Sequence, residues 1–107
     1  MAFKRHAVQV SALRRSILEA PGATSPEDRA AAARGERAIP LAEDYLDKVR
    51  SASFRITDDD VDRLQKAGLA DDAIFELTLA AAFGEARRRF DVAMSALEKP
   101  PEADDAP

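Results

Sequence analysis

Few side chains in this sequence combine a reactive group with a position in which it could do chemistry. Glu76 is the best candidate, because it interrupts a nearly continuous apolar run, and a buried carboxylate can act as a general acid or base. We favour a structural role, in which Glu76 pairs with an arginine of another helix or subunit, or points outward near a helix start. Glu85 is the second, weaker carboxylate candidate for catalysis.

The one histidine of the chain, His6, follows Lys4 and Arg5. An imidazole titrates near neutral pH and could serve as a general base. No carboxylate stands close to it in sequence, so we expect a solvated histidine near the N-terminus. The chain has no cysteine, which excludes disulfides, thiol nucleophiles and thiolate metal ligands. We therefore expect no metal centre and no cofactor.

Three consecutive arginines, Arg87, Arg88 and Arg89, could contact phosphate. Glu85 stands one helical turn before them and is spaced to pair with Arg88 or Arg89. A solvated helix face or a salt-bridge patch at an interface is therefore the better interpretation. The four aspartates of residues 58–62 do not form a calcium loop, since Leu69 occupies the position of the final glutamate ligand.

Composition and charge limit the class of protein. The 107 residues carry 16 Lys and Arg against 20 Asp and Glu, a net charge of −4, and 46 % are hydrophobic. This mixture is typical of one folded domain, and the acidic balance argues against nucleic acid or an anionic membrane as the partner. The near-apolar run of residues 77–83 is too short to span a bilayer. The start of the chain lacks the features of a signal peptide, so we expect a cytoplasmic protein.

Hydrophobic spacing predicts an all-α fold of about five helices in a single domain, residues 1–98. The first two helices are predicted over residues 7–20 and 26–33. The first has a buried stripe of Val10, Leu13 and Ile17, and the second begins after a Ser25 cap and ends before Gly35. The acidic, proline-rich residues 99–107 are expected to be a disordered tail.

Three further helices are predicted at residues 40–51, 57–67 and 71–97. Leu41, Tyr45 and Val49 form the stripe of the third, and Phe54 and Ile56 are expected to enter the core from the connection that follows. Thr57 caps the fourth helix, and Gly68 ends it. The long Ala-rich fifth helix is apolar nearly all round over residues 73–83, so it is either the central core helix or partly covered by another subunit.

The sequence of residues 56–83, in which a helix ends at Lys66-Ala67-Gly68-Leu69 and the run AIFELTLAAAF follows, resembles the alkylhydroperoxidase-D-like (AhpD-like) or carboxymuconolactone decarboxylase superfamily. The resemblance extends over about residues 40–97. It implies an all-helical, commonly oligomeric protein whose subunits bury an apolar helical face. The peroxidase branch uses a Cys-x-x-Cys and histidine motif that has no counterpart here, so thiol peroxidase chemistry is excluded.

We therefore expect a non-catalytic AhpD-like module that forms a homo-oligomer or binds a protein partner. The candidate interface residues lie on the last helix, where core packing is the competing interpretation for the apolar four: Phe75, Leu79, Phe83, Phe90 and Arg88. The alternative is an enzyme of the decarboxylase type that acts on a small organic acid at a subunit interface. It would use Glu76, Glu85 or an arginine for acid–base chemistry.

Overall fold

The computed structural model describes residues 2–98, and side chains from Ala7 onward. This part of the chain folds into the helices α1 (Ala2–Leu18), α2 (Pro26–Arg34), α3 (Glu43–Ser51), α4 (Asp58–Lys66) and α5 (Asp71–Glu98). Two 3-10 turns, η1 (Pro40–Ala42) and η2 (Ser53–Arg55), flank α3. No strand occurs between residues 2 and 98. The prediction of an all-α fold with a long C-terminal helix is therefore confirmed.

Local sequence signals determine most of the helix ends. The Ser25 Oγ accepts a hydrogen bond of 3.1 Å from the backbone N–H of Asp28 at the start of α2. Gly35 ends that helix with φ 79°, a left-handed conformation in which a residue without Cβ is unstrained. At the start of α4, Thr57 and Asp60 form a reciprocal capping box. These caps confirm the boundaries predicted for the second and fourth helices.

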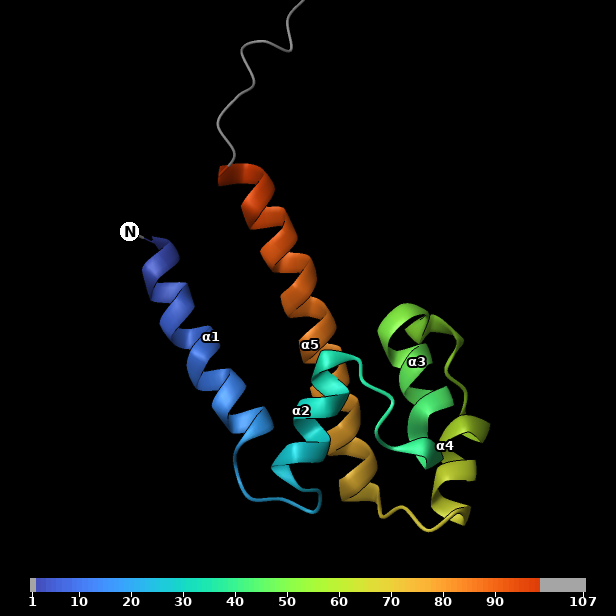
Figure 1. Ribbon diagram of the computed structural model, residues 1–107. Coiled ribbons are helices and arrows are strands. Elements are labelled where there is room, and N and C mark those ends of the chain that lie inside the picture. Colours follow the sequence, from blue (N-terminus) through green and yellow to red (C-terminus); the bar gives the residue numbers. More distant parts are fainter. Residues whose placement is uncertain (1, 99–107) are drawn as a thin grey trace, which may run out of the picture.

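Helix α5 is the centre of the fold, with α2 packed on one side and α3 and α4 on another (Figure 1). The core is built from small and medium side chains, since Ala32, Leu46, Ala80 and Ala81 are all inaccessible to solvent. The first half of α5 is therefore the central helix, and the part of its surface that remains exposed includes Phe75 and Leu79.

The alanines of α2 allow this short helix to lie unusually close to α5. A Cβ atom at Gly84 would stand only 1.9 Å from the backbone oxygen of Ala33. Only glycine fits this crossing, because any side chain would overlap the α2 backbone. Helix α2 has little apolar surface. Close packing of its backbone on α5, rather than large side chains, therefore holds it in place.

Polar contacts attach the remaining helices. The hydroxyl groups of Tyr45 on α3 and Thr78 on α5 share a hydrogen bond of 2.7 Å. Lys48 Nζ donates to Asp60 Oδ1 at 2.8 Å and so joins α3 to α4. This Lys48 contact is the main reason that the pKa of Asp60 is held below its usual value.

Three apolar side chains expected in the core are exposed instead. Leu13 and Leu41 are each 52 % exposed, and Phe54 is 86 % exposed. In α1 only Ile17 and Leu18 are buried among the described side chains, and Phe54 lies in the 3-10 turn η2 rather than on a helix face packed against the core. The expectation for Ile56 is confirmed, since it packs partly buried against the core.

The helix boundaries also differ in detail from the prediction. The first helix spans Ala2–Leu18 rather than residues 7–20, and a 3-10 turn replaces the first residues of the predicted third helix. Arg29, which is 2 % exposed, ends α1 by donating hydrogen bonds to the carbonyl oxygens of Ile17 and Ala20. The predicted tail, residues 99–107, and the His6 side chain lie outside the described residues.

Candidate functional site

Two helical arms extend from the body of the molecule: α1 before residue 17 and α5 from about residue 86 onward (Figure 1). They give the chain a radius of gyration of 17.2 Å. A compact domain of this length has a radius of gyration of about 13 Å. The arms carry exposed apolar side chains, namely Val8 and Leu13 on α1 and Phe90, Val92 and Leu97 on α5.

The inner sides of the two arms form an apolar trough, a hollow of about 220 Å³ lined by Val10, Leu13, Phe83, Ala86, Arg87 and Phe90. Apolar residues on α5 recur here at alternating steps of four and three, at positions 79, 83, 86, 90, 93 and 97. Alternating steps of four and three residues are the spacing of helices that pack side by side along a seam. The exposed part of α5 therefore has the pattern of a helix with a helical neighbour.

A second hollow of about 330 Å³ lies at the root of the arms, where α1, α2 and α5 meet. Its apolar floor comes from Leu18, Ala30, Ala33, Phe83 and Gly84, and its remaining lining is Arg14, Arg34, Arg87 and Arg88. We call this the root hollow. Phe83 and Arg87 line both the root hollow and the trough, so the two are continuous.

The four arginines of the root hollow come from three different helices. Arg88 Nη1 donates to the Ala33 carbonyl oxygen at 2.7 Å, and its Nη2 donates to Glu85 at 2.7 Å. Arg34 pairs with Glu36, and Arg87 Nε lies 3.3 Å from Asp91. Glu85 is also 3.4 Å from Arg89. The contacts of Glu85 confirm the pairing predicted from its spacing, and the hydrogen bond from Arg88 is the main cause of its lowered pKa.

The carboxylate of Glu76 has a structural role, because its hydrogen bonds connect α5 to the loop between α1 and α2. Its Oε1 accepts hydrogen bonds from the Thr24 hydroxyl at 2.6 Å and the Thr24 N–H at 2.8 Å, and its Oε2 accepts one from the Ala23 N–H at 2.8 Å. The Thr24 hydroxyl is the largest influence that lowers the pKa of Glu76. The carboxylate thus holds the α1–α2 loop on α5, and Gly22 leaves space for it, since a Cβ there would lie 2.6 Å from Oε2.

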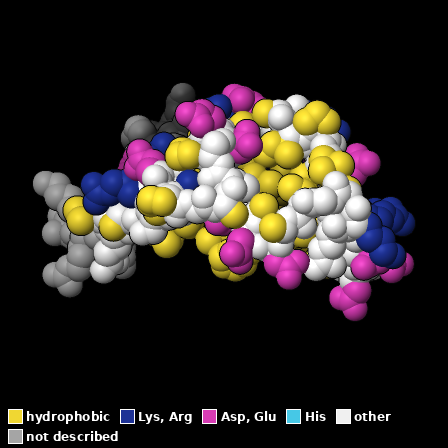
Figure 2. All heavy atoms as spheres, turned by 90° about the horizontal axis from the view of Figure 1, so that it is seen from below, with side chains coloured by type: hydrophobic (Ala, Val, Ile, Leu, Met, Phe, Trp, Pro, Cys, Tyr) yellow, Lys and Arg dark blue, Asp and Glu magenta, His cyan; other side chains and the backbone are white. Residues whose placement is uncertain are grey.

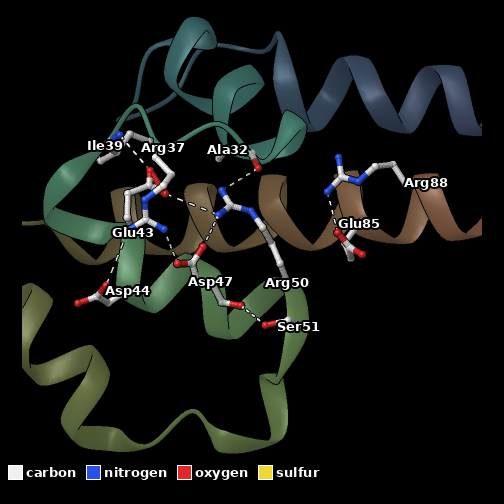
Figure 3. Close-up of polar contacts among 10 residues, drawn as sticks. All are labelled: Ala32, Arg37, Ile39, Glu43, Asp44, Asp47, Arg50, Ser51, Glu85 and Arg88. Carbon is white, nitrogen blue, oxygen red and sulfur yellow. Dashed lines mark hydrogen bonds and ion pairs between the residues drawn. The ribbon is translucent and has the colours of Figure 1, made fainter.

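An ionic cluster joins α3 to the loop before it and to α2 (Figure 3). The nearly inaccessible Glu43 accepts a hydrogen bond from the Ile39 N–H and lies 3.6 Å from Arg50. Arg50 also donates to Asp47 and, at 3.1 Å, to the carbonyl oxygen of Ala32. Buried charges in contact with one another and with backbone carbonyls position helices, and this cluster fixes α3 against α2.

The opposite end of the molecule carries another apolar surface. Figure 2 shows apolar side chains gathered in a hollow between α5 and the side of α3 and α4. The hollow of about 390 Å³ is lined by Tyr45, Val61, Gln65, Asp71, Ile74, Phe75 and Thr78. Its Phe75 is 65 % exposed, and charged side chains surround the face.

The predicted interface residues separate into two groups. Phe83 is partly buried against the core, whereas Phe75, Leu79 and Phe90 are exposed, which corrects the core interpretation for these three. Phe83 and Phe90 lie at the trough with Arg88 close by in the root hollow, and Phe75 lies at the other end of the molecule. The arginines Arg14 and Arg34 were not singled out from sequence, because nothing local indicates that they approach α5.

Among the described residues, no group of three or more His, Cys, Asp or Glu side chains is placed to hold a metal ion. None of the helices within residues 2–98 has both the length and the apolar character needed to cross a membrane. Comparison of the chain with protein-family models, curated proteins and solved structures gives no match.

Proposed function

We propose that this chain is a self-associating helical module of the AhpD-like type, in which two copies pair through α1 and α5. The observation that carries the proposal is the exposure of apolar side chains along both arms, with Phe90 49 % exposed and Leu97 76 % exposed. Apolar surface of this kind on adjacent helices is typical of an association site.

The energetics of α1 support a partner for the arms. Only Ile17 and Leu18 of this helix are buried among its described side chains. A helix of this length is marginal in water without packing of an apolar face. A second copy whose arms cover Val10 and Leu13 would supply that packing.

A two-fold symmetric dimer suits the arms because each copy brings two neighbouring helices that carry exposed apolar side chains. The four arms of the two copies then pack as a four-helix arrangement, in which every arm is covered. An antiparallel crossing of the two α5 helices centred on Phe90 brings Leu97 of each copy to the level of the partner's Phe83. This register uses the part of the apolar seam between residues 83 and 97.

The alternative from the sequence, an acid–base enzyme, gains no support from its candidate residues. Both oxygens of Glu76 are occupied by the α1–α2 loop, and both oxygens of Glu85 face arginines. A general acid or base needs an oxygen within reach of a substrate. We therefore propose an associating rather than a catalytic role.

Size-exclusion chromatography with light scattering tests the proposal. We expect the mass of two copies at high micromolar concentration, and the mass of one copy for the double variant Leu13→Glu, Phe90→Glu. The control is Phe54→Glu, which places the same charge on an exposed phenylalanine outside the arms and should leave the dimer unchanged. A wild-type chain that is monomeric throughout this range, with native circular dichroism, would contradict the proposal.

A further inference from the structure

The root hollow has a composition that self-association does not require. Four of its nine lining residues are arginines, and no carboxylate is among them. The chain as a whole is acidic, with a net charge of −4. Each arginine is paired with a carboxylate outside the lining: Arg14 with Glu19, Arg34 with Glu36, Arg87 with Asp91 and Arg88 with Glu85. Guanidinium donors gathered around one hollow can bind an anion that replaces such a partner.

We propose that the root hollow binds an amphiphilic anion, a small molecule with an alkyl chain and a carboxylate or phosphate head group. The head group would lie among Arg14, Arg34 and Arg87. Guanidinium groups present forked donors that match both carboxylate and phosphate, so both head groups share this chemistry.

The present partners of these arginines do not block a ligand. Arg14 lies 3.9 Å from Glu19, Arg34 is bound to Glu36 and Arg87 to Asp91, and these six side chains are between 43 % and 59 % exposed. Exposed ion pairs of this kind contribute little to stability, because solvent screens both charges. A ligand head group therefore exchanges with a weakly held carboxylate, while Arg88 stays fixed on the Ala33 carbonyl oxygen.

The apolar floor of the root hollow would contact the alkyl chain of the ligand. Leu18, Ala33 and Gly84 are buried, and Phe83 continues from the floor into the trough between the arms. An alkyl chain anchored by its head group among the arginines would pack on this floor, against Leu18 and Phe83. Burial of each CH₂ group removes apolar surface from water and so strengthens the binding of such a ligand.

The size of the site agrees with a small molecule. The root hollow measures about 330 Å³. Small-molecule sites begin at about 300 Å³ and are mostly apolar with a few placed polar groups. Phe83 and Arg87 also border the trough, so the site adjoins the surface proposed for association.

Titration followed by 1H–15N NMR tests the site with four probes: decanoate, decyl phosphate, decanol and inorganic phosphate. We expect decanoate and decyl phosphate to bind and to shift the amides of Leu18, Ala33 and Phe83. Decanol lacks the charge and inorganic phosphate lacks the chain, so each should bind about tenfold or more weakly. The ratio of the two amphiphile affinities identifies the preferred head group. Decanol binding as tightly as decanoate would overturn the proposal.

A matched pair of double variants tests the arginines. Arg34→Gln with Arg87→Gln should weaken decanoate binding about tenfold or more. The control, Arg63→Gln with Lys66→Gln, removes the same charge from exposed positions on α4 and should leave the affinity unchanged. Equal decanoate affinities of the two double variants would contradict the proposal that the arginines of the root hollow bind the head group.

The test separates this site from the proposed dimer. Phe90→Glu acts on the association seam, whereas Arg34 lies on α2, away from that seam. Arg87 borders both hollows, so the mass of the arginine double variant is measured together with its affinity for decanoate. If the chain is monomeric and the arginine variant still weakens decanoate binding, the result supports the proposed ligand site and contradicts the proposed dimer. If the wild-type chain dimerises and does not bind decanoate, the result supports the proposed dimer and contradicts the proposed ligand site.

Discussion

The carbonyl oxygen of Ala33 occupies the space that a side chain at Gly84 would need, 1.9 Å from the position of its Cβ. The same oxygen accepts a hydrogen bond from Arg88 one turn further along α5. Helices α2 and α5 thus meet backbone to backbone, and this contact also forms one wall of the root hollow.

Gly84→Ala should lower the free energy of unfolding by about 1–3 kcal/mol, because the methyl group forces α2 away from α5. At an unconstrained helical position the same change would raise stability by about 1 kcal/mol through helix propensity. The sign of the effect in urea unfolding therefore tests the close approach. An unchanged or increased midpoint would show that the two backbones do not touch at Gly84.

Glu76→Gln should lower the free energy of unfolding at neutral pH by about 1–3 kcal/mol, the range for hydrogen bonds to a charged group. The folded state holds the pKa of Glu76 below its ordinary value, so the carboxylate stabilises the fold above that ordinary value. This contribution disappears as the pH falls through the lowered folded pKa.

Urea unfolding of both chains at neutral and acidic pH measures the effect. The difference between wild type and Glu76→Gln should be full at neutral pH and diminish in acid. Glu98→Gln, an exposed carboxylate near the end of α5, is the control and should show little difference at either pH. A constant difference across the range would contradict the hydrogen-bonded carboxylate.

Arg50→Met should be strongly destabilising, by about 3–5 kcal/mol, because it leaves the buried Glu43 without its cation. Adding Glu43→Gln to this variant should restore part of the lost stability, since the uncompensated charge is then removed. A double-mutant cycle measured by chemical unfolding gives the coupling. Strictly additive effects of the two substitutions would show that the pair does not interact.

Arg29→Met should increase hydrogen exchange at the end of α1, because this side chain donates to the carbonyl oxygens of Ile17 and Ala20. Each lost hydrogen bond from the charged group lowers stability by about 1.5–3 kcal/mol. Arg15→Met, an exposed arginine in the last turn of α1, is the matched control. Equal exchange in the two variants would contradict the role assigned to Arg29.

The residues near each helix end determined much of the secondary structure without tertiary information. Ser25 and Thr57 cap the backbone N–H groups of their own helices, and Gly35 adopts the left-handed turn that ends α2. These interactions connect residues a few positions apart, so their spacing in sequence is sufficient to predict them. The all-α fold and the long last helix follow from the same local preferences.

The tertiary structure alone decided what each apolar or charged face meets. Leu13 and Phe54 have the sequence character of core residues, yet the directions of α1 and η2 leave them exposed. Arg14 and Arg34 share a hollow with Arg88 only because Gly84 lets α2 lie against α5. Periodicity indicates that a face is apolar, but only the crossing of helices distant in sequence determines which face is covered and which charges come together.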